Sequence, residues 1–126
     1  MSNFRLLPRA VTTITPQRVG FAGGGTDLPA FYRQHGGAVL SSAIDKYIYV
    51  TVKRHSSLFN ENYRLSYSKT EHVNTLAEIE NDIARECLRL VDVEPPLFIA
   101  TASDLPVSSG LGSSSSFAVG LLYALH

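Results

Sequence analysis

A glycine- and serine-rich run near the end of the chain has the composition of a phosphate-binding loop. It spans residues 106–116 and lies between an apolar segment at 97–101 and a strongly apolar one at 117–125. This order predicts a strand, a loop and a helix. Gly110 and Gly112 have no Cβ, so the loop backbone can turn sharply and approach a ligand closely. The candidate nucleotide-binding residues are Pro106, Ser108, Ser109, Gly110, Leu111, Gly112, Ser113, Ser114 and Ser115.

The serines of this run supply hydroxyl groups and backbone N–H groups where the helix is expected to begin. The first N–H groups of a helix have no partner inside the helix, and the helix dipole makes that end partly positive. A phosphate group fits such a place. A plain connection with a serine cap is the alternative interpretation. Two loop glycines, four consecutive serines and apolar segments on both sides favour the phosphate interpretation.

A second glycine-rich segment, residues 18–27, combines a cation, a tight turn and a carboxylate. Arg18 precedes a short extended piece, where a fixed cation could serve a phosphate or a transferring phosphoryl group. Asp27 follows the glycines, and its carboxylate could accept hydrogen bonds from a polyol. The alternative is a strand, a glycine turn and a capped helix without a ligand. The candidate substrate-binding residues are Gly24, Gly25, Thr26 and Asp27.

Neither loop matches the two common nucleotide-binding motifs. No Gly-Lys-Ser/Thr follows the serine run, so it is not a Walker A loop, and Ser115 stands where the dinucleotide fingerprint has glycine or alanine. A dinucleotide-dependent oxidoreductase that uses residues 20–25, with Asp45 on a ribose, is a rival interpretation. Its glycine spacing does not match, and strands follow where helices should alternate. Tight NADH binding without ATP binding would favour it.

The elements that must position these loops follow one another irregularly. Strands are expected at 10–15, 18–22, 38–44, 47–53, 63–67 and 97–101, with Pro16 interrupting the first pair and a turn at 45–46. A helix capped by Thr26 or Asp27 should run to about His35 and end at the glycines 36–37. Consecutive strands without helices between them predict an α+β fold and not a doubly wound sheet.

Two further helices are expected. One long helix is predicted from apolar residues that recur at helical spacing and form one stripe, namely Leu76, Ile79, Ile83, Cys87 and Leu90. The final helix, residues 117–125, is apolar on almost every side and has no capping residue at His126. Such a helix is normally buried in a larger body, so we expect an incomplete chain that aggregates or forms a homo-oligomer when isolated.

The composition is that of a globular protein with one modest domain. Of 126 residues, 44% are hydrophobic and 17% charged, and the formal net charge is zero, which weighs against a module for nucleic acid or anionic membranes. Cys87 is the only cysteine, which excludes an internal disulfide and favours a reducing, cytoplasmic setting. The first ten residues show no signal peptide, no run is long enough to span a membrane, and the histidines lack metal-ligand spacing.

The serine loop resembles the second motif of the GHMP kinases, which include galactokinase, homoserine kinase, mevalonate kinase and phosphomevalonate kinase. Ser115 departs from the alanine that is usual there. The segment from Arg18 to Asp27 resembles the first motif, in which galactokinases have Gly-Glu-His-Thr-Asp; here Gly24 and Gly25 replace Glu-His. The string at 23–32, with residues 43–47, is similar to the branch that phosphorylates D-glycero-D-manno-heptose 7-phosphate. The resemblance extends over essentially the whole chain.

The resemblance implies a two-layer fold like ribosomal protein S5 domain 2. Residues 1–126 would form the N-terminal portion of an ATP- and Mg²⁺-dependent kinase, with the C-terminal remainder absent. By the same resemblance, residues 110–115 would hold phosphates, Ser114 would contribute to Mg²⁺, Arg18 would stabilise the transferring group, and Thr26 with Asp27 would orient the sugar.

The substrate implied by the resemblance is a small-molecule sugar phosphate, and a fucokinase- or galactokinase-type reaction is the alternative. A general base and a third motif would lie beyond residue 126. The rival from another class is an RNA-binding module of the same fold. The zero net charge and the absence of a basic, aromatic stripe count against that rival.

Overall fold

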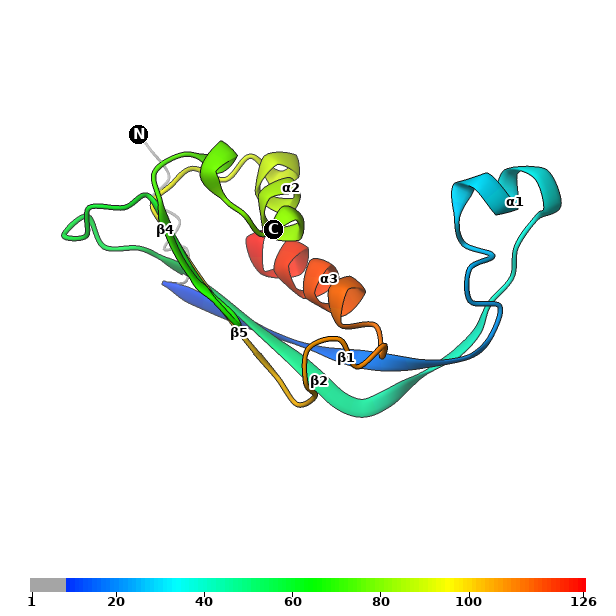
Figure 1. The fold of residues 1–126 in the computed structure, drawn as a ribbon. Coiled ribbons are helices and arrows are strands. Elements are labelled where there is room, and N and C mark those ends of the chain that lie inside the picture. Colours follow the sequence, from blue (N-terminus) through cyan, green and yellow to red (C-terminus); the bar gives the residue numbers. More distant parts are fainter. Residues whose placement is uncertain (1–8) are drawn as a thin grey trace, which may run out of the picture.

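The computed structural model describes residues 9–126 and contains one five-stranded sheet with helices on one face (Figure 1). Most of the segment considered for a signal peptide therefore lies outside the described residues. The elements are β1 Ala10–Ala22, α1 Pro29–His35, β2 Leu40–Arg54, β3 Tyr63–Ser66, β4 Thr70–Val73, the 3₁₀ helix η1 Leu76–Glu78, α2 Asp82–Val91, β5 Leu97–Ser103 and α3 Ser113–Leu125. The strand order is β1-β2-β5-β3-β4, and β3 pairs with β5 in parallel while the other neighbours are antiparallel. The predicted α+β class is confirmed.

The core lies between the sheet and the helices. Strand residues alternate between the two faces, and every second residue in the central strands is buried. Helix α3 packs on β1 and β2, and α2 packs on α3. The buried apolar side chains are Ile48, Val50, Val52, Tyr63, Leu65, Ile79, Ala84, Cys87, Leu88, Leu97, Ile99 and Leu121. This packing fixes the start of α3 against the middle of β1.

Two predicted breaks in the strands are wrong. β1 continues through Pro16, because it is an edge strand, where a missing N–H is tolerated. β2 continues through residues 45–46, which form an irregularity and not a turn. The ladder steps from Pro16 opposite Tyr47 to Arg18 opposite Ala43, so three residues of β2 face Gln17 alone. Pairing with β1 on both sides of this bulge keeps β2 continuous.

The predicted long helix is wrong, because two separate helix starts occupy its sequence. Thr75 and Glu78 form a capping box around η1, and the Asn81 side chain then accepts a hydrogen bond from the Ala84 N–H to begin α2. These caps divide the apolar stripe: Ile79 is buried between the helices, whereas Leu90 is exposed. The short strand β4 was not predicted.

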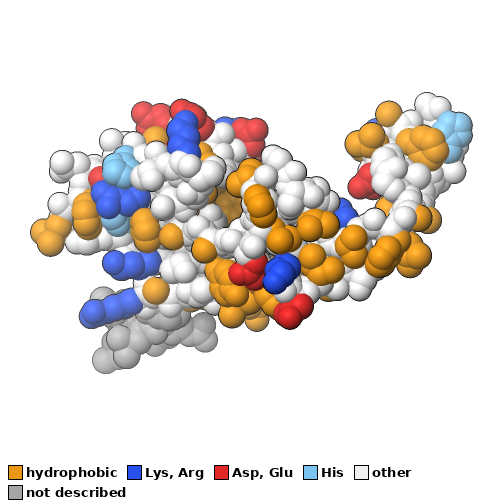
Figure 2. Space-filling model, turned by 60° about the horizontal axis from the view of Figure 1, so that its bottom comes forward, with side chains coloured by type: hydrophobic (Ala, Val, Ile, Leu, Met, Phe, Trp, Pro, Cys, Tyr) orange, Lys and Arg blue, Asp and Glu red, His pale blue; other side chains and the backbone are white. Residues whose placement is uncertain are grey.

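The outer parts of β1 and β2, together with α1, extend away from the helix layer as an arm, defined as residues 20–43 (Figure 1). Helix α1 starts at Pro29 with Leu28 as its N-cap, so the predicted caps Thr26 and Asp27 are wrong, and it ends at Gly36 as predicted. Large apolar side chains line the arm (Figure 2), namely Phe21, Leu28, Phe31, Tyr32, Val39 and Leu40. No helix among the described residues is long and apolar enough to cross a bilayer.

Candidate active site

The serine loop, residues 106–115, has the backbone geometry of an anion-binding turn. Ser108, Gly110 and Gly112 have positive φ angles of 65°, 74° and 79°. Gly112 is the N-cap of α3, and its carbonyl accepts the first helical hydrogen bond from the Ser116 N–H at 3.0 Å. The N–H groups of the residues between them, Ser113 to Ser115, therefore have no partner inside the helix. Alternating backbone turns of this kind, next to a helix start, bind anions.

Arg18 lies directly against this loop. Its backbone N–H donates to the Leu111 carbonyl at 2.9 Å. A Cβ on Gly112 would lie 2.8 Å from Arg18 Cγ, so only glycine lets the arginine side chain pass so close. Arg18 is exposed and forms no ion pair with another residue of the range 9–126. The structure thus places an unpaired guanidinium beside the start of α3.

One hollow, of about 520 Å³, opens beside the loop between the end of β5, the start of α2 and the start of α3. Pro106, Ser113 and Ser114 belong to its wall. Its apolar wall comes from Ile48, Ile83, Leu105, Val107 and Phe117. The first hollow thus combines an apolar wall with the polar start of α3, a combination that is typical of ligand sites.

A second hollow, of about 280 Å³, lies at the base of the arm. Arg18, Gly24 and Asp27 all line it, so the structure brings the predicted cation and the predicted carboxylate of the segment 18–27 into one place. The remaining wall residues are Gly20, Phe21, Ala22, Val39 and Ser41. Because Arg18 also packs on Gly112, the second hollow adjoins the serine loop.

Thr26 has a clear structural contact. Its hydroxyl lies 2.7 Å from the Gly23 carbonyl and 3.0 Å from the Ala38 carbonyl, and it accepts the Ala38 N–H at 3.2 Å. The glycine at 23 is required here, because a Cβ would lie 1.9 Å from the Ala38 oxygen. Thr26 therefore fixes the glycine turn against the strand that follows α1, and Asp27 beside it faces the hollow. Gly25 is exposed in the same turn.

Gln17, a polar residue beside the loop, was not singled out from the sequence, and Ser116 entered only as the last of four consecutive serines. The buried Gln17 donates from Nε2 to Ser113 Oγ at 2.8 Å, and the buried Ser116 donates to the Pro16 carbonyl at 2.9 Å. Thr13 likewise donates to the Gly120 carbonyl at 2.8 Å. The available signal was the strand period, since positions 13 and 17 fall on the same face of β1. Polar residues on a buried strand face indicate partners across the interface.

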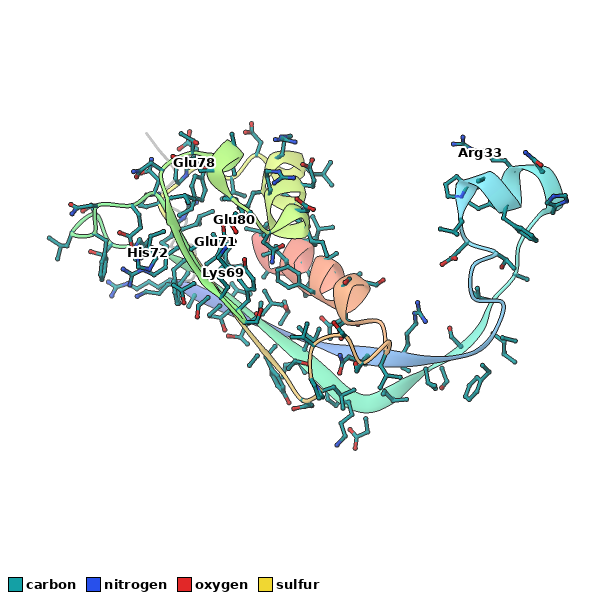
Figure 3. The ribbon with its side chains drawn as sticks, viewed as in Figure 1. Arg33, Lys69, Glu71, His72, Glu78 and Glu80 are labelled. Carbon is teal, nitrogen blue, oxygen red and sulfur yellow. The ribbon has the colours of Figure 1, made fainter. Side chains whose placement is uncertain are left out.

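The buried carboxylate of Glu71 binds two residues that line the first hollow, Tyr67 and Asn81. Glu71 accepts hydrogen bonds from the Glu80 N–H at 2.7 Å, the Asn81 N–H at 3.2 Å and the Tyr67 hydroxyl at 2.8 Å. Tyr67 and Asn81 both line that hollow. Figure 3 shows Glu71 with Lys69 and Glu80 between β4 and the start of α2, and Lys69 forms an ion pair with Glu80.

The hydrogen bonds around Glu71 also set its ionisation. Burial acts to raise the pKa of Glu71, but the two N–H donors and the Tyr67 hydroxyl outweigh it and lower the pKa below its ordinary value of 4.5. Burial, together with the carboxylate, raises the pKa of Tyr67 to about 12. The wall of the hollow is therefore built around a fixed negative charge with a neutral phenol beside it.

A family model described as "GHMP kinases N terminal domain" matches residues 74–126, which include the serine loop. The chain is 34% identical over 125 residues to the D-glycero-alpha-D-manno-heptose 7-phosphate kinase of Campylobacter jejuni, covering 92% of this chain and 37% of that protein. The segment before residue 74, with the arm and Arg18, is thus included in a sequence similarity as well.

Solved structures share the fold. A D-glycero-D-manno-heptose 1-phosphate kinase from Bacteriodes thetaiotaomicron matches with a TM-score of 0.71 and 27% identity, over 90% of this chain and 40% of that one. The mevalonate kinase of Methanococcus jannaschii matches with a TM-score of 0.65 and 25% identity, over 91% and 39%. The chain therefore spans about two fifths of the length of these relatives. Its fold is the predicted one, which resembles that of ribosomal protein S5 domain 2. From the family match, the sequence similarity and the shared fold together, the chain belongs to the GHMP kinase family.

Proposed function

We propose that the protein containing this chain is an ATP- and Mg²⁺-dependent sugar kinase that phosphorylates the anomeric hydroxyl of D-glycero-D-manno-heptose 7-phosphate. Residues 1–126 would be its N-terminal portion, carrying both the nucleotide loop and the sugar loop. The names of the Campylobacter jejuni and Bacteriodes thetaiotaomicron relatives support a heptose phosphate as the substrate class. The buried free thiol of Cys87 suits a reducing, cytoplasmic setting.

One observation carries the proposal: Arg18 lines the second hollow and packs on Gly112 of the serine loop. A phosphoryl donor at the loop and an acceptor hydroxyl beside Asp27 would thus meet at a guanidinium group. Phosphoryl transfer depends mainly on positioning and on neutralising charge, and little covalent chemistry is asked of the protein. The arrangement meets both needs with residues of one strand and one loop.

Each residue then has a defined task. The N–H groups of residues 113–115 bind phosphate oxygens, and the apolar wall of the first hollow receives the base. The Arg18 guanidinium stabilises negative charge on the group in transfer. Asp27 accepts hydrogen bonds from sugar hydroxyls, and Thr26 keeps the turn in place. The general base would come from a part of the protein beyond residue 126.

The residues at the helix start fit a magnesium ion. Mg²⁺ binds through few protein oxygens and otherwise uses phosphates and water, so one exposed hydroxyl is a sufficient donor from this segment. Ser114 is exposed on the first turn of α3 and lines the first hollow. The ion would neutralise charge on the phosphates. The contribution of this chain is the Ser114 hydroxyl beside the free N–H groups.

The test is a coupled ADP-release assay on the full-length protein with D-glycero-D-manno-heptose 7-phosphate, fucose and galactose as acceptors. We expect turnover with the heptose phosphate, and phosphorus NMR should show the new phosphate on the anomeric carbon. Turnover with fucose or galactose alone would replace the substrate assignment. ATP hydrolysis that none of the acceptors increases would contradict the proposed function.

A matched pair of variants tests the role of Arg18. Arg18→Gln should lower kcat by about a hundredfold, since it removes one charge contact made in the transition state. Arg89→Gln is the control, because Arg89 is exposed on α2 and pairs with Glu86 far from the loop. Equal activity of the two variants would show that the Arg18–Gly112 contact is structural only.

A further inference from the structure

We infer that Gln17 is a positioning residue that directs the hydroxyl proton of Ser113 toward a bound phosphate. The inference rests on the proposed nucleotide site at the start of α3. It assigns a task to a residue that lies outside both glycine-rich segments, at the base of the arm. Gln17 acts through Ser113 and does not itself contact the ligand.

The geometry begins with a hydrogen bond between residues that are 96 positions apart in the sequence. Gln17 is fully buried, and its Nε2 donates to Ser113 Oγ at 2.8 Å. A hydroxyl has one proton and two acceptor lone pairs. Since the amide N–H occupies one lone pair, the Ser113 proton points away from Gln17. Ser113 lines the first hollow, so an anion at the helix start is the acceptor available to that proton.

The other end of the amide distinguishes Gln17 from a simple packing residue. Among the residues that the structure describes, Gln17 Oε1 is the buried side-chain polar atom without a hydrogen-bond partner. Leaving a buried acceptor unpaired costs free energy. Thr13 and Ser116 attach β1 to the same helix with bonds to backbone carbonyls and leave no such atom. Stability alone is therefore a poor reason for an amide at this buried position. The hydrogen bond that the amide donates to Ser113 is a better one.

The neighbouring residue strengthens the placement. The Arg18 N–H donates to the Leu111 carbonyl at 2.9 Å, and the Gln17 side-chain amide donates to the Ser113 hydroxyl. Two consecutive residues of β1 thus fix the two residues that flank Gly112, the N-cap of α3. The direction of the Ser113 proton and the position of the guanidinium are set by the same short piece of strand.

The experiment measures ADP binding to the full-length protein by isothermal titration calorimetry from about pH 6 to about pH 9, where a buried glutamate can change its charge. Gln17→Glu places an acceptor on Ser113, so the serine proton turns away from the phosphate. We expect its Kd for ADP to exceed that of wild type by about tenfold or more at high pH, the value of a hydrogen bond to a charged group. This ratio should shrink as the pH falls, because a protonated glutamate donates to Ser113 again.

A second pair keeps the test decisive if Gln17→Glu does not fold. Gln17→Met removes both the donor and the unpaired oxygen, so we expect weaker ADP binding with a Tm no lower than that of Thr13→Val. Thr13→Val, which breaks a bond between the same strand and helix, should bind ADP as wild type does. A purely structural role for Gln17 predicts the reverse, with a lower Tm and unchanged ADP affinity.

The outcomes separate the two proposals. If wild type binds ADP and the Gln17 variants bind it equally well at every pH, the inference is overturned and the proposed function stands. If wild type binds no ADP, with or without Mg²⁺, the proposed function fails and the inference fails with it.

Discussion

At the scale of single residues, Arg18 is where the nucleotide side and the sugar side of the proposed site meet. Its backbone holds Leu111, its side chain crosses Gly112, and its guanidinium lines the second hollow. The sequence alone indicated the chemistry of Arg18, Asp27 and Ser114 from residue type and from the resemblance to the GHMP kinases. It could not show that Arg18 touches Gly112, because that contact joins distant parts of the chain. Gln17 was missed although it shares a strand face with Thr13, and its bond to Ser113 joins the same distant parts of the chain.

The Ser114 hydroxyl is expected to matter for the chemical step more than for sugar binding. Ser114→Ala in the full-length protein should lower kcat by about a hundredfold, because it removes an electrostatic contact at the transferring phosphate. The KM for the sugar phosphate should change little, since Ser114 lies on the side of the first hollow. Steady-state kinetics at saturating ATP and Mg²⁺ measures both values. Ser57→Ala is the control, because Ser57 is exposed and lines neither hollow. A wild-type kcat for Ser114→Ala would remove Ser114 from the mechanism.

Asp27 is expected to act on the sugar alone. Asp27→Asn should raise the KM for the sugar phosphate by about tenfold, the value of weakened hydrogen bonds to a charged acceptor. The Kd for ADP should stay unchanged, because Asp27 lines the second hollow and not the first. Separate calorimetric titrations with ADP and with the sugar phosphate decide this, with Asp82→Asn as the control. A defect confined to ADP binding would show that the two hollows are assigned the wrong way round.

At the scale of the elements, local hydrophobic pattern predicted the central strands and α3, and it failed where caps and pairing decide. The apolar stripe from Leu76 to Leu90 suggested one helix, but the capping box at Thr75 and the cap at Asn81 start two. These caps are readable in the sequence and were outweighed by the stripe. The bulge opposite Gln17 could not be predicted from the sequence, because it depends on β1 pairing with β2 both before and after this point.

The carboxylate of Glu71 should make the free energy of unfolding depend on pH, because it joins β4 to the start of α2. Its pKa is lowered in the folded state, so its contribution is complete above the ordinary value of 4.5 and is lost as pH falls through the lowered pKa. Glu71→Gln should lower the free energy of unfolding by about 1–3 kcal/mol at neutral pH, because a buried N–H loses its acceptor. The difference from wild type should shrink below pH 4.5.

Chemical denaturation at several pH values measures this difference. Glu80→Gln is the control, since its side chain is exposed and its ion pair with Lys69 lies at the surface. A difference between wild type and Glu71→Gln that is the same at acidic and neutral pH would mean that the Glu71 charge does not stabilise the wall of the first hollow.

At the scale of the whole molecule, large apolar side chains are exposed on the arm and on α3. Phe21, Leu28 and Leu40 on the arm are each more than half exposed, at 65%, 61% and 64%. The final helix was predicted to be apolar on all sides, and α3 buries one face while Val119 and Tyr123 are exposed at 60% and 77%. The chain also spans only 37% of its Campylobacter jejuni relative.

Residues 1–126 alone are therefore expected to self-associate and not to transfer phosphoryl groups. Each large apolar side chain left in water forgoes about 1.5–3 kcal/mol of burial, against a domain stability of about 5–15 kcal/mol. Light scattering on the purified chain measures association, and the ADP-release assay measures turnover beside the full-length protein. A soluble monomer with the turnover of the full-length protein would contradict this expectation.

The way the arm is attached has an evolutionary consequence. The arm joins the helix layer through the β1–β2 ladder, whose bonds link backbone groups, and within the described residues α1 buries none of its side chains. Because α1 packs extensively on no other element of the described residues, most substitutions at the tip are expected to leave the serine loop undisturbed. Under the proposed function, the acceptor preference can therefore change by substitutions in the arm while the serine loop stays the same. Under that proposal, proteins that share this fold and this loop can evolve different acceptors without losing a folded structure.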